Sequence, residues 1–394
     1  AGSAIIFAYI GDYYNVFPMQ FMKAIPQRIF GTMTNEILMA VPLFVFMGTM
    51  LEKSKVAEEL LENMDKVFRK VRGGLGISVS IVGALLAAST GIVGATVVTM
   101  GLLSLPTMLK KGYDPKIATG TVAAAGTLGQ IIPPSIVLVL LGDVLSNAYQ
   151  KSQLDMGVFS PETLSVGDLF AGALLPGLLL VCFYIAYQIL KSFIDPLSIP
   201  AVSNDYYNDK ERTNILFILF PPLFLIISVL GSILTGFATP TEAASVGAIG
   251  SILLATYKTS DEKIWPVISA LIFMILILSS IFLDLRINRI GLTSLNSFAI
   301  IISLILLLIF SFSIVMCLKN LFDNKILSET AYSTTKITSM VFIILIGATF
   351  FSLVFRGLGG DETIEELLLS IPGGVVGAVI AVMITMFILG FFLD

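Results

Sequence analysis

Long apolar stretches separated by short polar ones dominate this sequence and predict a series of helices that cross a membrane. A helix needs roughly 20 apolar residues to cross a bilayer. Stretches that meet or approach this length, with shorter apolar segments between them, predict helices at residues 35–51, 169–190, 215–235, 237–256, 264–283, 298–318 and 337–355. We therefore predict an all-α, polytopic membrane protein.

The apolar pattern first becomes irregular at residues 73–112, which are too long for one crossing. Their centre is polar, with Ser89, Thr90 and Gly91 in sequence. Basic residues flank the segment on both sides: Lys66, Arg69, Lys70 and Arg72 before it, and Lys110, Lys111 and Lys116 after it. The positive-inside rule places both flanks in the cytoplasm. The segment is therefore predicted to be a re-entrant hairpin with its polar tip near the membrane midplane, where irregular backbone must be enclosed by protein or line a cavity.

A second irregularity follows at residues 114–144. Gly126, Gly129, Pro133 and Pro134 interrupt an otherwise apolar stretch. Proline and glycine break helices, so this segment is predicted to be a transmembrane helix broken at mid-membrane depth. A polar loop is expected after it, at residues 146–167.

The end of the chain resembles its beginning. Arg72-Gly73-Gly74-Leu75-Gly76 opens the first hairpin, and Pro372-Gly373-Gly374-Val375-Val376-Gly377 opens the final apolar run. An apolar helix and an amphipathic connector precede each motif. The offset that separates Gly73 from Ser89 leads from Gly373 to Leu389. This internal similarity predicts a second hairpin whose tip lies at the end of the chain.

Charge placement gives the two hairpins opposite directions. With residues 52–72 in the cytoplasm, counting crossings puts residues 356–370 outside. Acidic residues dominate that segment: Asp361, Glu362, Glu365 and Glu366. An inverted repeat with broken helices that meet at the midplane is typical of secondary transporters. Arg286 and Arg289 fall on the predicted outside and count against the scheme.

Composition excludes other classes of protein. Apolar residues make up 56% of the 394 residues and charged residues 13%, against about 25% charged in soluble domains. The net charge is −4 and no basic patch suited to nucleic acid is present. Histidine is absent, and no nucleophile–base pair or metal cluster is visible in the sequence, so an enzyme is disfavoured. A channel remains open on hydropathy alone.

Several long motifs resemble the large membrane subunit of tripartite ATP-independent periplasmic (TRAP) transporters. The resemblance covers roughly residues 30–257 and 331–394. The motifs that carry it are AASTGIVGATVVTMGLLSLPTMLKKGYDP, ATGTVAAAGTLGQIIPPSIVLVLLGD, VGDLFAGALLPG, FATPTEAASVGA, GATFFSLVFRGLGGD and FILGFFLD.

This resemblance implies a sodium-coupled importer of an organic acid anion, such as a dicarboxylate, keto acid or sugar acid, that works by an elevator movement. It implies two partners, a small membrane subunit and a periplasmic substrate-binding protein, and a place in the bacterial or archaeal inner membrane. Na⁺ is the coupling ion and no other cofactor is expected. The alternative is an ion-coupled anion transporter of the same superfamily that needs no binding protein.

The sequence departs from the short form of that family in two ways. A pair of apolar spans within residues 258–330 is read as an insertion. The start of the first helix and the second arm of the last hairpin are expected to lie outside this sequence. Five segments are predicted. Residues 1–72 form an N-terminal scaffold and surface stretch, 73–145 the first hairpin with the broken helix, 146–257 connecting helices, 258–330 the insertion and 331–394 the second repeat.

Small polar residues at the hairpin tip and at the helix break are candidate sodium ligands. Hydroxyls and the free carbonyls of unwound helix ends suit a small hard cation. The candidates are Ser89, Thr90, Gly91, Gly94, Gly126, Thr127 and Gly129, with Asp394 at the second tip. Close helix packing by small residues is the competing interpretation.

Candidate substrate contacts lie beside the sodium candidates. Ser135 begins a half-helix whose dipole favours an anion, and the resemblance adds Thr96 and Gln130. Arg356 either attracts the anion or anchors its helix at the interface. Structural roles at the site are expected for Pro133 and Pro134, which shape the break, and for Thr241 and Glu242, which open a helix where a capping role competes with a functional one.

Overall fold

The computed structural model describes residues 1–54, 56–68, 71–90, 93–200, 215–260, 262–283 and 294–392. Regular structure in these ranges is entirely helical, as the apolar pattern predicts. The chain divides into two compact units, one made of Ala1–Asn35 and Ser339–Asp394 and the other of Glu36–Thr338.

The first unit packs around Phe17. It contains α1, η1, α2, the end of α14, α15 and α16, with bounds Gly2–Tyr13, Met19–Ala24, Ile25–Met33, Ile326–Gly357, Gly360–Leu369 and Gly374–Leu389. Phe17 is 1% exposed and clusters with Ala4, Ala8 and Val354. Helices α15 and α16 meet at a bend of 118°.

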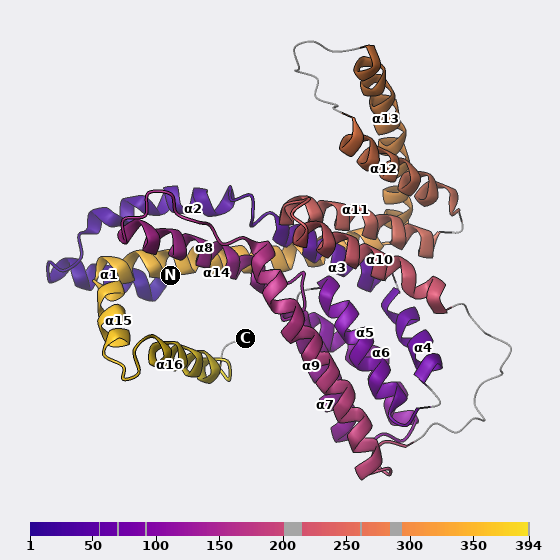
Figure 1. The fold of residues 1–394 in the computed structure, drawn as a ribbon, viewed down its shortest axis with the longest axis horizontal. Helices are drawn as coiled ribbons and strands as arrows, with labels where there is room; N and C mark the ends of the chain where they lie inside the picture. The colour runs from indigo at the N-terminus through magenta and orange to yellow at the C-terminus, as the bar shows by residue number, and fades with distance from the viewer. Residues whose placement is uncertain are drawn as a thin grey trace. The chain divides into compact units, whose positions relative to one another are not determined.

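The second unit contains a helical hairpin, as predicted for residues 73–112. Its arms are α5 (Gly74–Thr90) and α6 (Val93–Lys110), which pack against each other. Gly73, just before α5, has a φ of +75°, which glycine adopts without a steric penalty. Helix α4 (Val56–Phe68) leads into the hairpin and runs beside it (Figure 1).

A broken helix packs against the hairpin. It consists of α7 (Pro115–Thr127), the short 3₁₀ helix η2 (Leu128–Gln130) and α8 (Ile136–Asp155). Helix α7 contacts both arms. A Cβ atom on Gly83 of α5 would lie 2.6 Å from Cβ of Ala125 on α7. The missing side chain therefore lets the two backbones approach each other.

Helix α8 is longer than the sequence predicted. It continues to Asp155, so the expectation of a polar loop from Ser146 onward is wrong for its first ten residues, 146–155. A glycine with a φ of +81°, Gly157, follows the helix, and a left-handed glycine is common at helix ends. The loss of hydrophobicity at Ser146 therefore falls within a continuous helix.

Helix α9 (Val166–Ile194) places a buried amide against the hairpin. Gln188 is 2% exposed, and its Nε2 donates to Oγ1 of Thr121 in α7 at 2.6 Å. Its Oε1 has no hydrogen-bond partner among the described residues. That oxygen would lie 2.4 Å from a Cβ atom at Gly76 of α5. The amide therefore fills the space that this glycine leaves.

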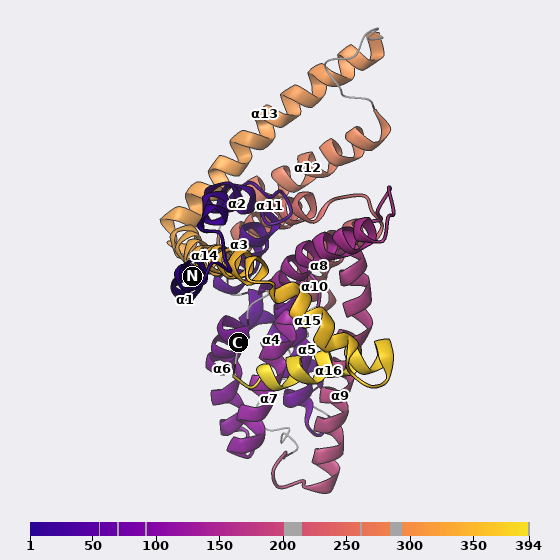
Figure 2. The same cartoon turned by 90° about the vertical axis from the view of Figure 1, so that its left-hand side faces the viewer.

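The remaining helices of the second unit gather around α3 and α11. These are α3, α10, α11, α12, α13 and the start of α14, with bounds Ala40–Lys53, Ile215–Leu234, Pro240–Thr259, Ile264–Phe282 and Ser294–Asp323 for the first five. Met50 of α3 packs with Leu253 of α11 and Cys317 of α13. Helices α12 and α13 lie side by side (Figure 2).

Four helices in the described part of the chain are long and apolar enough to cross a membrane. They are Val166–Ile194, Ile264–Phe282, Phe298–Asp323 and Ile326–Gly357, and the bent pair α15–α16 would make a fifth span if it counts as one. The hairpin arms and α10 are shorter apolar helices. The architecture is that of a polytopic helical membrane protein.

The crossing of α5 and α7 gives a first testable prediction. Gly83→Ala should destabilise the protein by about 1–3 kcal/mol, because the added methyl group overpacks the contact with Ala125. Gly120→Ala on α7 is the matched control, since a Cβ atom there meets nothing within 4 Å and alanine favours a helix over glycine. Thermal unfolding in detergent measures both. Equal midpoints for Gly83→Ala and the parent protein would contradict the packing argument.

Candidate functional site

The break between α7 and α8 satisfies part of its own backbone. Ser135 is fully buried and is the N-cap of α8. Its hydroxyl donates to the carbonyl of Gln130 at 2.7 Å and accepts from the amide of Leu138 at 3.5 Å. A cis peptide bond joins Pro133 to Pro134. The two prolines thus separate two helix ends that Ser135 connects by hydrogen bonds.

The start of α6 lies against this break. A Cβ atom at Gly126, near the end of α7, would lie 2.3 Å from Cγ2 of Val97, four residues after the start of α6. Both arms of the hairpin also contact η2. The fold therefore brings the tip end of the hairpin to the place where α7 unwinds.

The sodium candidates are distributed around this junction in different environments. Gly126 and Gly129 are buried, and Thr127 is exposed with its hydroxyl donating to the carbonyl of Ala124 at 2.8 Å. Gly94 is exposed at the start of α6, and a Cβ atom there would meet nothing within 4 Å. Gly126 therefore agrees with the interpretation that small residues allow close helix packing. Close packing does not account for the glycine at position 94, because a side chain there would meet no neighbour.

Four sodium candidates are described only in part or lie outside the described residues. Ser89 and Thr90 end the helical backbone of α5, and their side chains are outside the described part. Gly91 and Asp394 lie outside the described residues altogether, as do Arg286 and Arg289. The position of the break agrees with the predicted tip, because α5 ends at Thr90 and α6 begins at Val93.

The substrate candidates differ in their surroundings. Thr96 is 2% exposed near the start of α6, and Gln130 is half-buried at the end of η2. Both lie at the same junction as Ser135. Arg356 belongs to the first unit, where its Nε lies 3.2 Å from Oδ2 of Asp361, and both side chains are largely exposed.

Glu242 caps a helix. Thr239 is the N-cap of α11, and its hydroxyl accepts from the amide of Glu242, whose carboxylate accepts in turn from the amide of Thr239 at 2.8 Å. This capping box agrees with the capping interpretation. The hydroxyl of Thr241 donates to the carbonyl of Glu36 at 2.6 Å, so Thr241 and Glu242 both make structural contacts.

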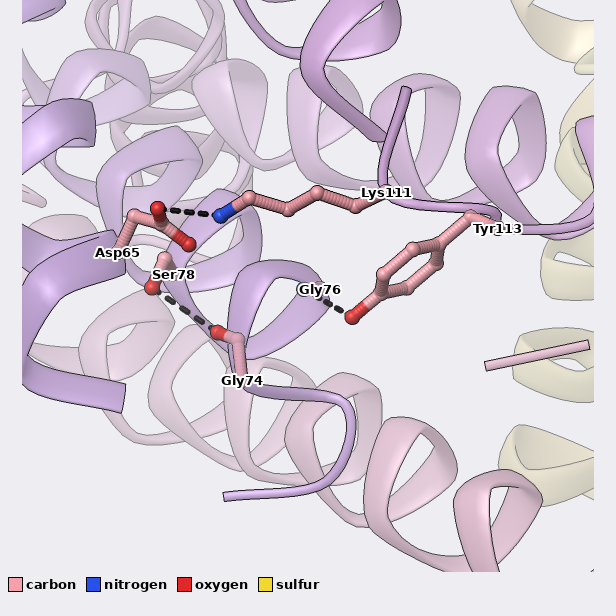
Figure 3. A network of polar contacts seen from close by, with 6 residues as sticks. All are labelled: Asp65, Gly74, Gly76, Ser78, Lys111 and Tyr113. Atoms are coloured by element: carbon pink, nitrogen blue, oxygen red, sulfur yellow. Dashed lines mark hydrogen bonds and ion pairs between the residues drawn. The ribbon is translucent and has the colours of Figure 1, made fainter. Parts of the chain in front are cut away.

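The base of the hairpin holds a polar network that the sequence did not single out (Figure 3). Oδ2 of Asp65, on α4, lies 2.5 Å from Nζ of Lys111, directly after α6. Both side chains are mostly buried. The amide of Gly76 donates to the hydroxyl of Tyr113 at 3.4 Å. Burial, and to a lesser degree the negative charge of Asp65, raises the pKa of Tyr113 to about 12. The network connects α4 to both arms of the hairpin.

A helical hairpin packed against a broken helix, among helices long enough to span a bilayer, defines a polytopic membrane protein of the transporter kind. The family model of the tripartite ATP-independent periplasmic transporter, DctM component, matches residues 1–264 and 257–394, and the chain belongs to this family. The second match includes residues 258–330, the segment that the sequence set apart as an insertion.

Curated relatives are large permease proteins of TRAP transporters. The C4-dicarboxylate permease DctM of Pseudomonas aeruginosa is 31% identical over 248 residues, covering 62% of this chain and 52% of the relative. The sialic acid permease SiaM of Vibrio cholerae is 29% identical over 235 residues, covering 58% and 49%. The ectoine permease TeaC of Halomonas elongata is 24% identical over 270 residues, covering 66% and 58%. The chain thus spans about half the length of the curated relatives it matches.

The N-cap at the break yields a second prediction. Ser135→Ala should lower the free energy of unfolding by about 1–2 kcal/mol, because the amide of Leu138 and the carbonyl of Gln130 both lose a partner. Ser165→Ala is the matched control, since Ser165 caps α9 with its hydroxyl 3.1 Å from the amide of Asp168 but is exposed. That variant should lose about 1 kcal/mol or less. Thermal unfolding measures both, and a Ser135→Ala protein as stable as the parent would contradict the capping role.

Proposed function

We propose that this chain is the large transmembrane permease subunit of a sodium-coupled TRAP transporter that imports an organic acid anion. A periplasmic binding protein delivers the anion, and a small membrane subunit completes the complex in the inner membrane. The relatives are named for dicarboxylates, sialic acid and ectoine. Two of these three ligand types, dicarboxylates and sialic acid, have carboxylates as their only charged groups, which supports an organic acid anion for this chain.

The observation that carries the proposal is the junction of the α6 start with the α7 break. There the helix ends of η2 and α8 supply backbone carbonyls and amides, and the positive end of the α8 dipole points toward the junction. Carbonyl and hydroxyl oxygens suit Na⁺, whereas the helix N-terminus suits a carboxylate. A bound cation lowers the cost of holding the anion at the same depth, because opposite charges attract strongly in a medium of low dielectric constant.

An inverted repeat with an elevator movement belongs to the same proposal. Helices α3, α4 and α5 follow one another as α14, α15 and α16 do: a helix with an apolar segment, an amphipathic connector and an apolar helix. Gly73 and Gly373 both have positive φ angles, +75° and +101°, and both directly precede the first residue of the apolar helix. The matched backbone geometry supports the sequence repeat, and the acidic residues of α15 support opposite orientations.

Sodium-driven uptake is the central test. The full-length protein, reconstituted with its small membrane subunit and its binding protein, should accumulate a labelled organic acid only with an inward sodium gradient. Ser89→Ala should raise the sodium concentration for half-maximal uptake at least tenfold. Ser80→Ala is the control on the same helix, since its buried hydroxyl donates to the carbonyl of Gly76 far from the tip.

The outcomes separate the alternatives. Uptake that ignores the sodium gradient would overturn the mechanism, and unchanged sodium dependence in Ser89→Ala would overturn the site. Equal uptake with and without the binding protein would instead indicate the binding-protein-independent transporter. Flux that fails to saturate with substrate would indicate a channel.

The proposed orientation predicts which side of the membrane each loop faces. In a protein without Cys182 and Cys317, a cysteine at Glu365 should react with a membrane-impermeant maleimide on intact spheroplasts. A cysteine at Lys110 should react only after lysis. Both side chains are exposed, so a cysteine that fails to react is shielded by the membrane and not by burial in the protein. Labelling of both positions from the same side would contradict the inverted repeat.

A further inference from the structure

Helices α3 and α4 make charged contacts in two directions, toward the hairpin and away from it. Toward the hairpin, Oε1 of Glu52 at the end of α3 accepts from the hydroxyl of Thr99 on α6 at 2.6 Å. Asp65 of α4 pairs with Lys111 at the hairpin base. Thr99 and Lys111 are twelve residues apart, about 18 Å along a helix. The two contacts therefore hold α6 at two heights.

Away from the hairpin, α4 is joined to α11. Glu59 pairs with Lys258 near the end of that helix. Helix α11 packs along α3 in the core that contains Met50 and Leu253. Helices α3, α4 and α11 are thus linked by an ion pair, a core and a short chain connection.

Apolar side chains line a crevice between the hairpin arm α5 and helices α3, α4 and α10. The crevice is lined by Leu85 and Leu86 of α5 on one side and by side chains of α3, α4 and α10 on the other: Leu51, Val56, Leu60, Leu219, Pro222, Leu223 and Ile226. Aliphatic side chains can slide past one another without losing directional bonds. Glu52–Thr99 and Asp65–Lys111, by contrast, are specific to one relative position.

The Asp65–Lys111 pair is mostly buried, so separating its two charges costs free energy. The side chains are 13% and 16% exposed. Opening such a pair within the protein would leave two buried charges uncompensated, so separation requires both to reach water. The predicted cytoplasmic end of the hairpin gives them that access. The backbone between α4 and α5 can turn at Gly73, whose φ of +75° is available to glycine at no cost.

We propose that Glu52–Thr99 and Asp65–Lys111 form a latch that holds the hairpin against α3 and α4 in the state seen here. The latch opens during each transport cycle, whereas the Glu59–Lys258 pair stays closed. This inference rests on the proposed function. It assigns positioning roles to residues outside the ion and substrate junction, and it places the moving boundary between α4 and α5.

Reversible cross-linking tests the latch. In a protein without Cys182 and Cys317, cysteines at Asp65 and Lys111 are joined by a short bis-methanethiosulfonate reagent. Sodium-driven uptake should fall at least tenfold and return on reduction. Cysteines at Glu59 and Lys258, joined by the same reagent, are the matched control and should retain uptake within twofold. Undiminished uptake with the first bridge, or equal arrest by the second, would overturn the latch.

A second measurement is independent of transport. Leu86, 4% exposed in the crevice, is replaced by cysteine, and its rate of reaction with a small methanethiosulfonate is followed. Lys111→Met should raise that rate at least fivefold by opening the crevice, and Lys258→Met should leave it unchanged. Equal rates in the two variants would overturn the latch even if uptake behaves as expected. Absence of sodium-driven uptake in the parent protein, with the difference in reaction rates intact, would instead reject the proposed function and, with it, the opening of the latch in a transport cycle, while the closed contacts that hold the hairpin would stand.

Discussion

Backbone groups that lose their helix partners inside an apolar protein must find others, and the junction of the hairpin and the broken helix depends on this constraint. An unpaired amide or carbonyl away from water costs several kcal/mol. The break after α7 meets part of that cost locally. The 3₁₀ turn of η2 ties the amides of Ile131 and Ile132 to the carbonyl of Leu128, and Ser135 bridges the two helix ends. These local hydrogen bonds make the interrupted helix a stable feature of the fold.

Small residues determine how closely the helices pack around the junction. Glycine at Gly83 and Gly126 brings α7 close to both hairpin arms. Val181 of α9 and Ile226 of α10 cover the break by packing with Leu128 and Ile132. Charged contacts lie toward the ends of these helices, at Glu52, Asp65 and Lys111. Apolar packing therefore sets the position of the junction, whereas these electrostatic contacts lie outside it, between the hairpin and helices α3 and α4.

Much of this arrangement could be predicted from the sequence because the signals are local. Glycine and proline mark the break, and the polar tip marks the end of α5. The predicted end of helix α8 is too early. The fall in hydrophobicity at Ser146 predicts a loop, whereas the backbone stays helical to Asp155. The contacts of Asp65 with Lys111 and of Gln188 with Thr121 could not be predicted. Each joins residues far apart in the sequence, and no periodicity records which pairs meet.

The amide of Gln188 has an evolutionary consequence. Its nitrogen donates to the hydroxyl of Thr121, and its oxygen occupies the space beside Gly76. The residue that fits at each of these three positions therefore depends on the other two. A methyl group at Gly76 would require a shorter side chain at position 188. That side chain could no longer donate a hydrogen bond to the buried hydroxyl of Thr121. Substitutions at these positions should therefore be tolerated in combination and rejected singly. Across relatives, the three positions are expected to vary together, as a correlated set rather than as independent sites.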